Sequence, residues 1–565
     1  MKRLDEGFIA GYACLSARAD LLDRINVFPV ADSDTGVNLR ISLAPLRSCG
    51  GIRTRVAEQL YRTATGNSGN IAASFFSEFL CAGDLDQLPE RAARGREKAW
   101  QAVADPKKGT MLGVFDRLSR ILIRWPLTLT GCPALLAALQ EVVLATASEL
   151  PDLSEARVVD AGALGMYVFF DGFFRSITGY ADNNSPLEAF FPGLLAVSEA
   201  FRPAATDSHC VDVLIRAANG RALDTKAAAA LGESVIVIPA EDQVKVHVHT
   251  SDPGKLREEL SRLGQIVAWS DQAMSAEDTA GADASPIHIM TDAAGSLPRE
   301  LARRHGISLL DSYVVAGAAA SPESLCSGEA IYARMRAGEK VTTAQASVFE
   351  RHQVYRSVCE QHGRTLYLCV GSAFTGNYET AMAWKSKHDA DNLFNILDTG
   401  AASGRLGLIA LLLARYARQA EDADAVLAHA RLLADCCREY VFIDVLRYLV
   451  AGGRLSRAGG FVGDLLHMKP VISPMPAGVK KAGMVRNARS QLAFAEEKLA
   501  REAADWEKAM ILLQYSDNRE WVSEVVLARI RARFPQAEIA VVPLSLTAGV
   551  HMGPGTWAVA FGPVA

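Results

Sequence analysis

Apolar residues between positions 51 and 178 recur every three or four positions, which is the spacing of one face of an amphipathic helix. This pattern predicts helices over residues 51–64, 73–82, 90–104, 110–124, 133–149 and 160–178, and a further helix that begins at Leu39. The alternation typical of strands is almost absent before residue 200. We therefore predict an all-α domain over residues 1–200.

The pattern changes after a polar break at residues 202–208. Alternation predicts strands over 211–215, 234–238 and 244–249, and helical spacing predicts a helix over 253–263. We expect a small α/β domain over residues 205–273. Residues 274–286 are rich in Ala, Asp, Gly and Ser, which predicts a linker.

Strands and helices alternate from residue 287 onward. Short apolar runs predict strands over 287–290, 365–370 and 394–397, and each is followed by a loop and a helix. Such a recurrence predicts a parallel sheet with functional loops at the carboxyl ends of its strands. We assign residues 287–565 to an α/β domain that ends in a mixed segment from Lys469. The fold class is multidomain.

Composition narrows the class of protein. The chain has 565 residues, of which 50% are hydrophobic and 22% charged, as in ordinary globular proteins with several domains. A net charge of −5 argues against a nucleic-acid partner. No apolar run reaches 18 residues, the N-terminus lacks a signal-peptide core, and ten cysteines are scattered without a framework. We expect a cytoplasmic protein with reduced thiols and no transmembrane segment.

Two carboxylates, Asp32 and Asp34, stand one residue apart in the segment Asn26-Val-Phe-Pro-Val-Ala-Asp-Ser-Asp-Thr-Gly-Val-Asn38. They repel one another unless a cation lies between them. Mg²⁺ suits such a pair, because it takes one or two carboxylates and leaves its other positions to water and phosphate. The alternative is a helix N-cap formed by Asp34, with Asp32 in solvent. The local pattern leaves both open.

A second candidate metal site lies in Lys245-Val-His-Val-His-Thr250. Strand alternation places His247 and His249 on one face and the two valines on the other. With Cys210 they form a plausible zinc set, completed by His209 or by water. The alternative is a pair of exposed or hydrogen-bonded histidines.

The first of these segments resembles the ATP- and Mg²⁺-binding domain of the dihydroxyacetone kinase L family, in its bacterial fatty acid kinase branch. Thr65-Gly-Asn-Ser-Gly69, Gly109-Thr110 and Val159-Asp-Ala-Gly-Ala-Leu-Gly165 resemble its later loops, in the same order. The resemblance implies a helical barrel that gathers these loops at one end, with Mg²⁺ on Asp32 and Asp34. By the same match, ATP would contact Asn26, Thr35, Asn38, Asn67, Ser68, Gly69, Thr110, Asp160 and Gly162. Residues 205–273 resemble the middle domain of the same branch, whose matched Cys and His-x-His residues bind zinc in some members. A closed site of this kind would be structural.

Residues 287–565 resemble the DegV family of bacterial fatty-acid-binding proteins. The matching segments are Met290–Pro298, Thr342–Ser347, Gly371–Tyr378, Asp398–Ser403, Gly452–Ser456 and Gly549–Gly555. The resemblance implies a long-chain fatty acid with its chain in an apolar tunnel. Its carboxylate would meet Thr343, Ser372, Thr375, Arg454 and His551, of which Arg454 and His551 would also serve the reaction with Asp32 and Asp34. Singly, each of these residues is also typical of a cap, a surface ion pair or a turn.

The chain departs from the family patterns at several positions. Ala31 and Ser33 replace the usual Pro and Gly beside the aspartates, and Thr65 replaces a basic residue. In the second half, Ala344 and Ala346 replace Ser and Pro, and Gly371 and Thr375 replace serines. The Thr65 change bears on nucleotide affinity, and the later changes bear on the pose of the acid.

The leading hypothesis is a kinase domain fused to its acyl carrier, which would phosphorylate a bound fatty acid with ATP and Mg²⁺ to give an acyl phosphate. One alternative is a fatty-acid-binding or sensing protein with a non-catalytic kinase-like domain. Another is one subunit of a glycerone (dihydroxyacetone) kinase, and the DegV-like half argues against it. A homodimer and a transient membrane contact are both compatible with the sequence.

Overall fold

A computed structural model describes residues 2–49, 53–125, 127–180, 185–202, 208–217, 229–239, 243–273, 285–317, 319–451 and 468–564. The chain forms two compact units, Met1–Asp278 and Thr279–Ala565. Most of the expected linker, residues 274–284, lies outside the described residues, as does Arg454 with its Gly452–Ser456 segment.

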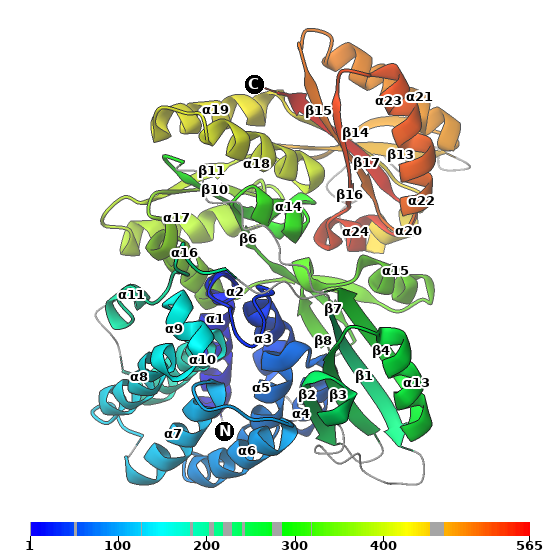
Figure 1. Ribbon diagram of the computed structural model, residues 1–565. Coiled ribbons are helices and arrows are strands. Elements are labelled where there is room, and N and C mark those ends of the chain that lie inside the picture. The colour runs from blue at the N-terminus through cyan, green and yellow to red at the C-terminus, as the bar shows by residue number, and fades with distance from the viewer. Residues whose placement is uncertain are drawn as a thin grey trace. The chain divides into compact units, whose positions relative to one another are not determined.

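The first unit begins with a layer of helices that close on themselves (Figure 1). Successive contacts run from α1 through α3, α5, α6, α7, α8 and α10 back to α1, which makes a barrel. The helices are α1 (Lys2–Ser16), α2 (Ala19–Arg24), α3 (Thr35–Leu43), α4 (Arg53–Thr63), α5 (Gly66–Phe79), α6 (Leu88–Ala102), α7 (Met111–Arg124), α8 (Cys132–Glu149), α9 (Pro151–Ala156), α10 (Ala161–Thr178) and α11 (Leu187–Phe190).

Aromatic side chains fill the barrel. Phe75 of α5 stacks on Phe115 of α7 with ring centroids 4.0 Å apart, and phenylalanines of α1 and α10 surround them. Helix α1 lies so close to α10 that a Cβ atom on Gly11 would stand only 2.7 Å from the carbonyl oxygen of Phe169. The barrel therefore has a closely packed aromatic interior, so a ligand would have to bind at the helix ends.

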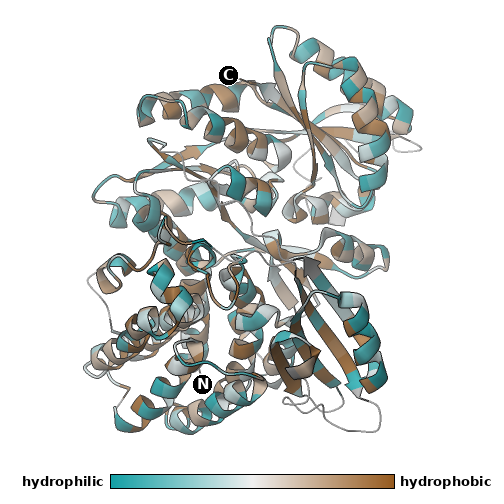
Figure 2. Ribbon diagram, viewed as in Figure 1, coloured by the Kyte–Doolittle hydropathy of each residue, from teal (hydrophilic) through white to brown (hydrophobic). Residues whose placement is uncertain are grey.

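A small antiparallel sheet completes this unit, in the strand order β2-β3-β1-β4. Its elements are β1 (His209–Ala217), β2 (Glu233–Pro239), β3 (Gln243–Thr250), α13 (Pro253–Leu263) and β4 (Gly264–Ala273). Val246 and Val248 pack with α13 in the sheet's core. In Figure 2 the strands are mainly brown and the outer helix α13 is mainly teal. The polar face of β3 therefore lies on the side opposite this core.

The second unit contains a four-stranded sheet in the order β11-β10-β5-β6, with all three pairings parallel. A six-stranded sheet, β14-β13-β12-β17-β15-β16, is antiparallel except between β15 and β16. A third sheet, β8-β7-β9, is antiparallel. The strands are β5 (His288–Asp292), β6 (Ile307–Leu310), β7 (Ser312–Ala316), β8 (Ala319–Pro322), β9 (Val341–Gln345), β10 (Thr365–Cys369), β11 (Phe394–Asp398), β12 (Arg438–Phe442), β13 (Lys469–Met475), β14 (Gly478–Val485), β15 (Ala509–Tyr515), β16 (Glu538–Pro543) and β17 (Trp557–Pro563).

The apolar run Leu406–Leu413 lies in α18, which contacts both the parallel and the six-stranded sheet and is buried almost throughout. The other helices of this unit are α14 (Arg299–Arg304), α15 (Gly328–Arg336), α16 (Val348–His362), α17 (Asn377–His388), α18 (Ser403–Ala417), α19 (Ala423–Cys436), α20 (Leu446–Ala451), α21 (Ala488–Glu502), α22 (Arg519–Trp521), α23 (Leu527–Arg533) and α24 (Leu546–Met552).

The predicted fold class is confirmed: a helical first region, a small α/β region with strands, and an α/β region with a parallel sheet. Several predicted bounds were wrong. The helix predicted over 73–82 begins at Gly66, and the helix predicted from Leu39 begins at Thr35, because each starts in a glycine-bearing turn without apolar periodicity. Within the described residues, no helix is both long and apolar enough to cross a lipid bilayer.

Candidate functional site

The carboxylates Asp32 and Asp34 lie in the loop between α2 and α3, each held by an asparagine. Asn26 Nδ2 donates to Asp32 Oδ1 at 2.7 Å, and the side chain of Asn38 hydrogen bonds to Asp34. Ser33 between them has φ 55°, in the left-handed region that favours glycine. Asn26 and Asn38, which the sequence analysis assigned to the nucleotide, therefore also orient the acidic pair.

Asp34 stands at the N-cap position of α3, but its side chain makes no capping bond, so the cap interpretation was wrong. The cap comes from Asp23 in α2, whose Oδ1 accepts the N–H groups of Gly36 at 2.7 Å and Val37 at 3.1 Å. Because Asp23 satisfies the helix end, both loop carboxylates remain available to a ligand.

The acidic pair is costly to ionise without a cation. Burial and the negative charge of Asp32 raise the pKa of Asp34 to about 8, and burial raises the pKa of Asp32 as well. Both line a small pocket of about 10 Å³, together with Asn67 and His249. A volume of this size is about enough for one water molecule or one metal ion. The carboxylate oxygens of Asp32 and Asp34 suit a hard divalent cation.

A larger cavity of about 430 Å³ adjoins this pocket, and Pro29, Thr35, Asn67 and Ser68 line both. The N-terminal ends of α3, α5, α7 and α10 contribute to its wall. Residues lining it are Phe28, Pro29, Thr35, Asn67, Ser68, Ile71, Val103, Ala104, Asp105, Lys107, Thr110, Met111, Leu112, Asp160, Gly162 and Gly232–Ile236. The apolar residues offer a slot for a flat ring, and the helix ends lie near the acidic pocket.

The structure places Thr35, Asn67, Ser68, Thr110, Asp160 and Gly162 in this wall. Gly69 is elsewhere: a Cβ atom there would lie 2.1 Å from Ser42 Oγ, so Gly69 allows α5 to pack on α3. Asp160 Oδ1 accepts the N–H of Ala163 at 2.7 Å and so caps α10. Burial raises the pKa of Asp160 to about 7, against the opposing effect of its backbone hydrogen bonds.

The N-terminus of α5 is capped from outside the barrel, by Asp212 on β1. Asp212 Oδ2 accepts from Thr65 Oγ1 at 3.0 Å and from Gly66 N at 3.1 Å, while Oδ1 accepts from Asn70 Nδ2 at 3.0 Å. The first N–H of the glycine-rich turn is thus already bonded. Thr65, which stands in place of a basic residue, binds the α/β region.

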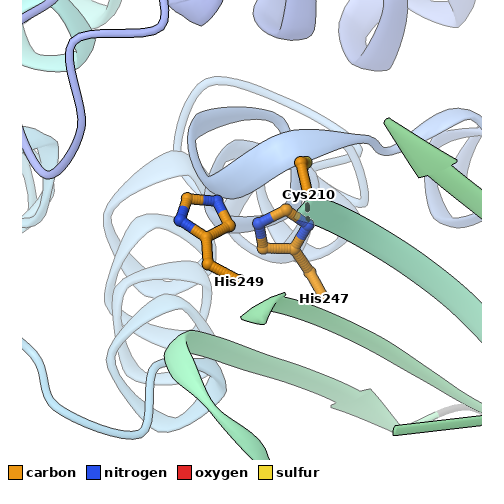
Figure 3. A group of neighbouring side chains, drawn as sticks. All are labelled: Cys210, His247 and His249. Carbon is orange, nitrogen blue, oxygen red and sulfur yellow. Dashed lines mark hydrogen bonds between the residues drawn. The ribbon is translucent and has the colours of Figure 1, made fainter. Parts of the chain in front are cut away.

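Cys210, His247 and His249 lie together beside this contact (Figure 3), with one ligand atom of each within 4.8 Å of the others. Their strands pair in register, Cys210 opposite His249 and Asp212 opposite His247. Both histidines are buried, at 1% and 4% exposure. His209 is not part of this group among the described residues.

The cluster's chemistry suits a metal such as zinc. His247 Nε2 and His249 Nδ1 are buried without a hydrogen-bond partner among the described residues. Burial and the neighbouring His247 lower the pKa of His249 to about 3, so its imidazole is neutral. Burial, then the charges of Asp212, Asp34 and Asp32, raise the pKa of the Cys210 thiol. A cation would relieve both penalties by taking the neutral nitrogens and a thiolate.

Sequence reasoning missed three residues of this site: Asp23, Asp212 and Lys107. Lys107 lines the cavity from the segment between α6 and α7, which is joined to β2 by the Ala104 N–H···O Val235 bond of 3.0 Å. Only Asp212 carried a sequence signal, because it lies two positions from Cys210 on an alternating strand.

In the second unit, Thr343 on β9 and His551 on α24 meet, with Thr343 Oγ1 and His551 Nε2 3.1 Å apart. Ser372 and Thr375 lie on another loop, between β10 and α17, where Thr375 Oγ1 accepts the N–H of Asn377. Arg454 lies outside the described residues. The structure thus pairs two of the expected head-group residues and places two more after β10, which belongs to a different sheet from β9.

Glu323 anchors the helix that carries His551. Its Oε1 accepts Thr547 N at 2.6 Å and its Oε2 accepts Thr547 Oγ1 at 2.5 Å. Glu323 also lines a cavity of about 780 Å³ between the ends of β5, β15 and β16 and helix α15, with a mixed apolar and polar wall. None of the four described head-group candidates lines that cavity.

Comparisons with known proteins divide the chain into three parts. Residues 29–175 match the family model described as DAK2 domain, and residues 207–280 match the model of the middle domain of FakA-like fatty acid kinase proteins. Residues 286–564 match "Uncharacterised protein, DegV family".

Among curated proteins, Protein YloV of Bacillus subtilis is 27% identical over 308 residues, or 48% of this chain and 55% of that protein. An uncharacterized protein of Staphylococcus epidermidis is 28% identical over 296 residues, or 46% of this chain and 52% of that protein. The chain spans about half the length of the curated relatives it matches.

Two solved structures resemble 49% of this chain and 99% of their own, both with a TM-score of 0.45. One is DegV, a fatty acid binding protein from Bacillus subtilis, at 20% identity. The other is a fatty-acid-binding DegV family protein from Thermus thermophilus, at 25% identity.

Proposed function

Because this chain joins a DAK2 domain, a FakA-like fatty acid kinase middle domain and a DegV domain, we propose that it phosphorylates a fatty acid with ATP. The DegV domain holds the acid, and the cavity of the first unit holds the nucleotide. The product is an acyl phosphate. The observation that carries this proposal is the acidic pocket of Asp32 and Asp34 opening beside a cavity of about 430 Å³.

The residues of the first unit fit Mg²⁺. Asp32 and Asp34 would hold it, and Asn26 and Asn38 fix the two carboxylates in place. When bound, Mg²⁺ supplies the positive charge that phosphoryl transfer requires, since such transfer rests mainly on positioning and charge neutralisation. Phe28, Ile71 and Met111 would enclose the base.

The residues of the second unit fit the acceptor. Thr343 and His551 would hydrogen bond to the carboxylate of the fatty acid, and Ser372, Thr375 and Arg454 remain candidates for the same head group. In the reaction, a carboxylate oxygen forms a bond to the γ-phosphorus while that phosphorus loses its bond to the oxygen bridging to the β-phosphate. ADP leaves, and the ionised acid has no proton to lose.

Zinc is proposed for Cys210, His247 and His249. One ligand atom of each residue lies within 4.8 Å of the others, against roughly 3.3–3.8 Å between ligands in tetrahedral zinc sites, so a closure of about 1 Å would suffice. Metal analysis of the purified chain measures the stoichiometry.

A fatty-acid-binding or sensing protein without phosphoryl transfer is the second candidate. The observation in its favour is that Asp212 occupies Thr65 Oγ1 and Gly66 N, where a basic residue and a free N–H would serve a phosphate. It predicts a co-purifying fatty acid without ATP turnover.

The test incubates the full chain with γ-labelled ATP, Mg²⁺ and oleate, and traps acyl phosphate with hydroxylamine as the hydroxamate. We expect product with the wild type and a loss of at least 100-fold with Asp32→Asn plus Asp34→Asn, because the metal loses its charged ligands. Asp84→Asn, an acid on a loop of the same barrel, is the control and should leave the rate unchanged. A wild type that binds oleate and ATP but forms no hydroxamate would sink the proposal.

A further inference from the structure

Asp212 makes bonds in two directions at once. Thr65, Gly66 and Asn70 donate to it from the α5 side, and His247 Nδ1 lies 3.3 Å from its Oδ1 on the sheet side. Two donors to each oxygen use the roughly four acceptor sites of a carboxylate.

Lys245, on the neighbouring strand β3, completes the same contact with the opposite charge. Its ammonium group donates to the carbonyl of Ala64 and, at 3.4 Å, to that of Tyr61, where α4 ends. The sheet thus sets a carboxylate at the N-terminus of α5 and an ammonium at the C-terminus of α4. Each charge complements the partial charge of its helix end.

The contact matters to the cavity, because the first turn of α5 carries Asn67 and Ser68 in its wall. Asn67 Nδ2 also lies 3.3 Å from His249 Nε2, so the turn and the histidine pair are joined a second time. On the other side, an N–H donated by His247 Nδ1 to Asp212 leaves Nε2 as the basic nitrogen, and that atom is buried without a partner among the described residues.

We propose that Asp212 is a positioning residue that couples the Cys210–His247–His249 cluster to the nucleotide cavity. It fixes the first turn of α5 for the nucleotide and the tautomer and orientation of His247 for a metal. Occupation of either site then stabilises the arrangement that the other site needs. The coupling rests on the proposed nucleotide cavity but not on phosphoryl transfer.

The coupling has a thermodynamic signature. If zinc tightens nucleotide binding by some factor, nucleotide must tighten zinc binding by the same factor. Titration calorimetry of ADP on the zinc-loaded and zinc-stripped full chain gives the first factor. Competition with a chromophoric chelator, with and without saturating ADP, gives the second. We expect both factors to be equal and about tenfold.

The variant Asp212→Asn keeps the size of the side chain but loses acceptor capacity and charge. We expect this variant to weaken the binding of ADP and of zinc about tenfold each. This is the lower end of the losses in metal affinity that are typical when a residue hydrogen bonded to a metal ligand is replaced. The same variant should also abolish the reciprocal effect. The matched control is Asp252→Asn: Asp252 caps α13 in the same region by accepting Lys255 N at 2.9 Å, so its loss affects stability but neither ligand.

Thr65→Val is the second variant and removes only one donor to the carboxylate. It should weaken ADP binding about threefold and leave zinc affinity unchanged. This variant also tests the proposal if Asp212→Asn fails to fold. Unchanged ADP affinity in the zinc-stripped wild type, or in Thr65→Val, would overturn the proposal. Hydroxamate formation by a wild type without coupling refutes the coupling alone. Coupling without hydroxamate refutes phosphoryl transfer alone.

Discussion

Replacing Lys107 with glutamine should weaken ATP binding about tenfold. Lys107 is the one cation among the described residues that line the cavity, which also carries Asp105, Asp160 and Glu233. A unit charge 4 Å from a phosphate oxygen is worth about 4 kcal/mol at an effective dielectric of about 20. The side chain is 51% exposed and pairs with Asp105 at 2.7 Å, so solvent and this competing partner reduce the gain to about 1.4 kcal/mol.

The neighbouring residue supplies the control. Lys108 is exposed and does not line the cavity, so Lys108→Gln changes the net charge equally without touching the ligand. Titration calorimetry of both variants with ATP and with adenosine separates the charge from the base. Of the four affinities, we expect only that of Lys107→Gln for ATP to fall. The loss should become smaller as the salt concentration rises. Equal losses in the two variants, or an equal loss for adenosine, would refute the assignment.

Two further predictions concern stability. Ser33→Gly should stabilise the first unit by about 0.5–1 kcal/mol, because it relieves the left-handed strain at φ 55° at some cost in chain entropy. Urea unfolding measures this change in stability, and a lower unfolding midpoint in the variant would contradict the reasoning. Burial raises the pKa of Glu439 from 4.5 to about 7, so the free energy of unfolding should fall by about 3 kcal/mol as pH rises from about 4.5 to 7 and then level off. The carboxylate of Glu439 accepts hydrogen bonds from the N–H groups of Gly404 and Arg405 at the start of α18. The stability of α18, measured by hydrogen exchange, should therefore fall with pH in the wild type but not in Glu439→Gln. An equal pH dependence in both proteins would refute this prediction.

Much of the fold was predictable because its periodicity is local. The helices of the barrel and the parallel strands follow from spacing along the chain. Helix α1 was missed, since glycines at positions 7 and 11 and an almost wholly buried first helix erase the contrast between its faces. The antiparallel pairings of the six-stranded sheet were missed as well, because short buried strands read alike whichever way they run.

The candidate site divides in the same way. Asp32, Asp34 and Asp160 stand in recognisable loops, and the structure places each beside a cavity. The residues that hold the helix ends were not foreseen: Asp23 acts across 13 positions and Asp212 across 146. Strand alternation indicates only the face of β1 on which Asp212 lies, and nothing in the local sequence indicates the helix end that either aspartate caps, because only folding brings donor and acceptor together.

The bond between Thr65 and Asp212 also bears on how such chains diverge and recombine. A basic residue at position 65, as the resembled family has, would turn this hydroxyl–carboxylate bond into an ion pair, so the two positions are expected to vary together. If the chain were cut near residue 200, α5 would lose its cap from Asp212, and the carbonyl groups that Lys245 hydrogen bonds would lose their partner. Grafts between relatives should therefore exchange the α4–α5 turn together with strands β1 and β3, although the matched family segments place these pieces in different domains.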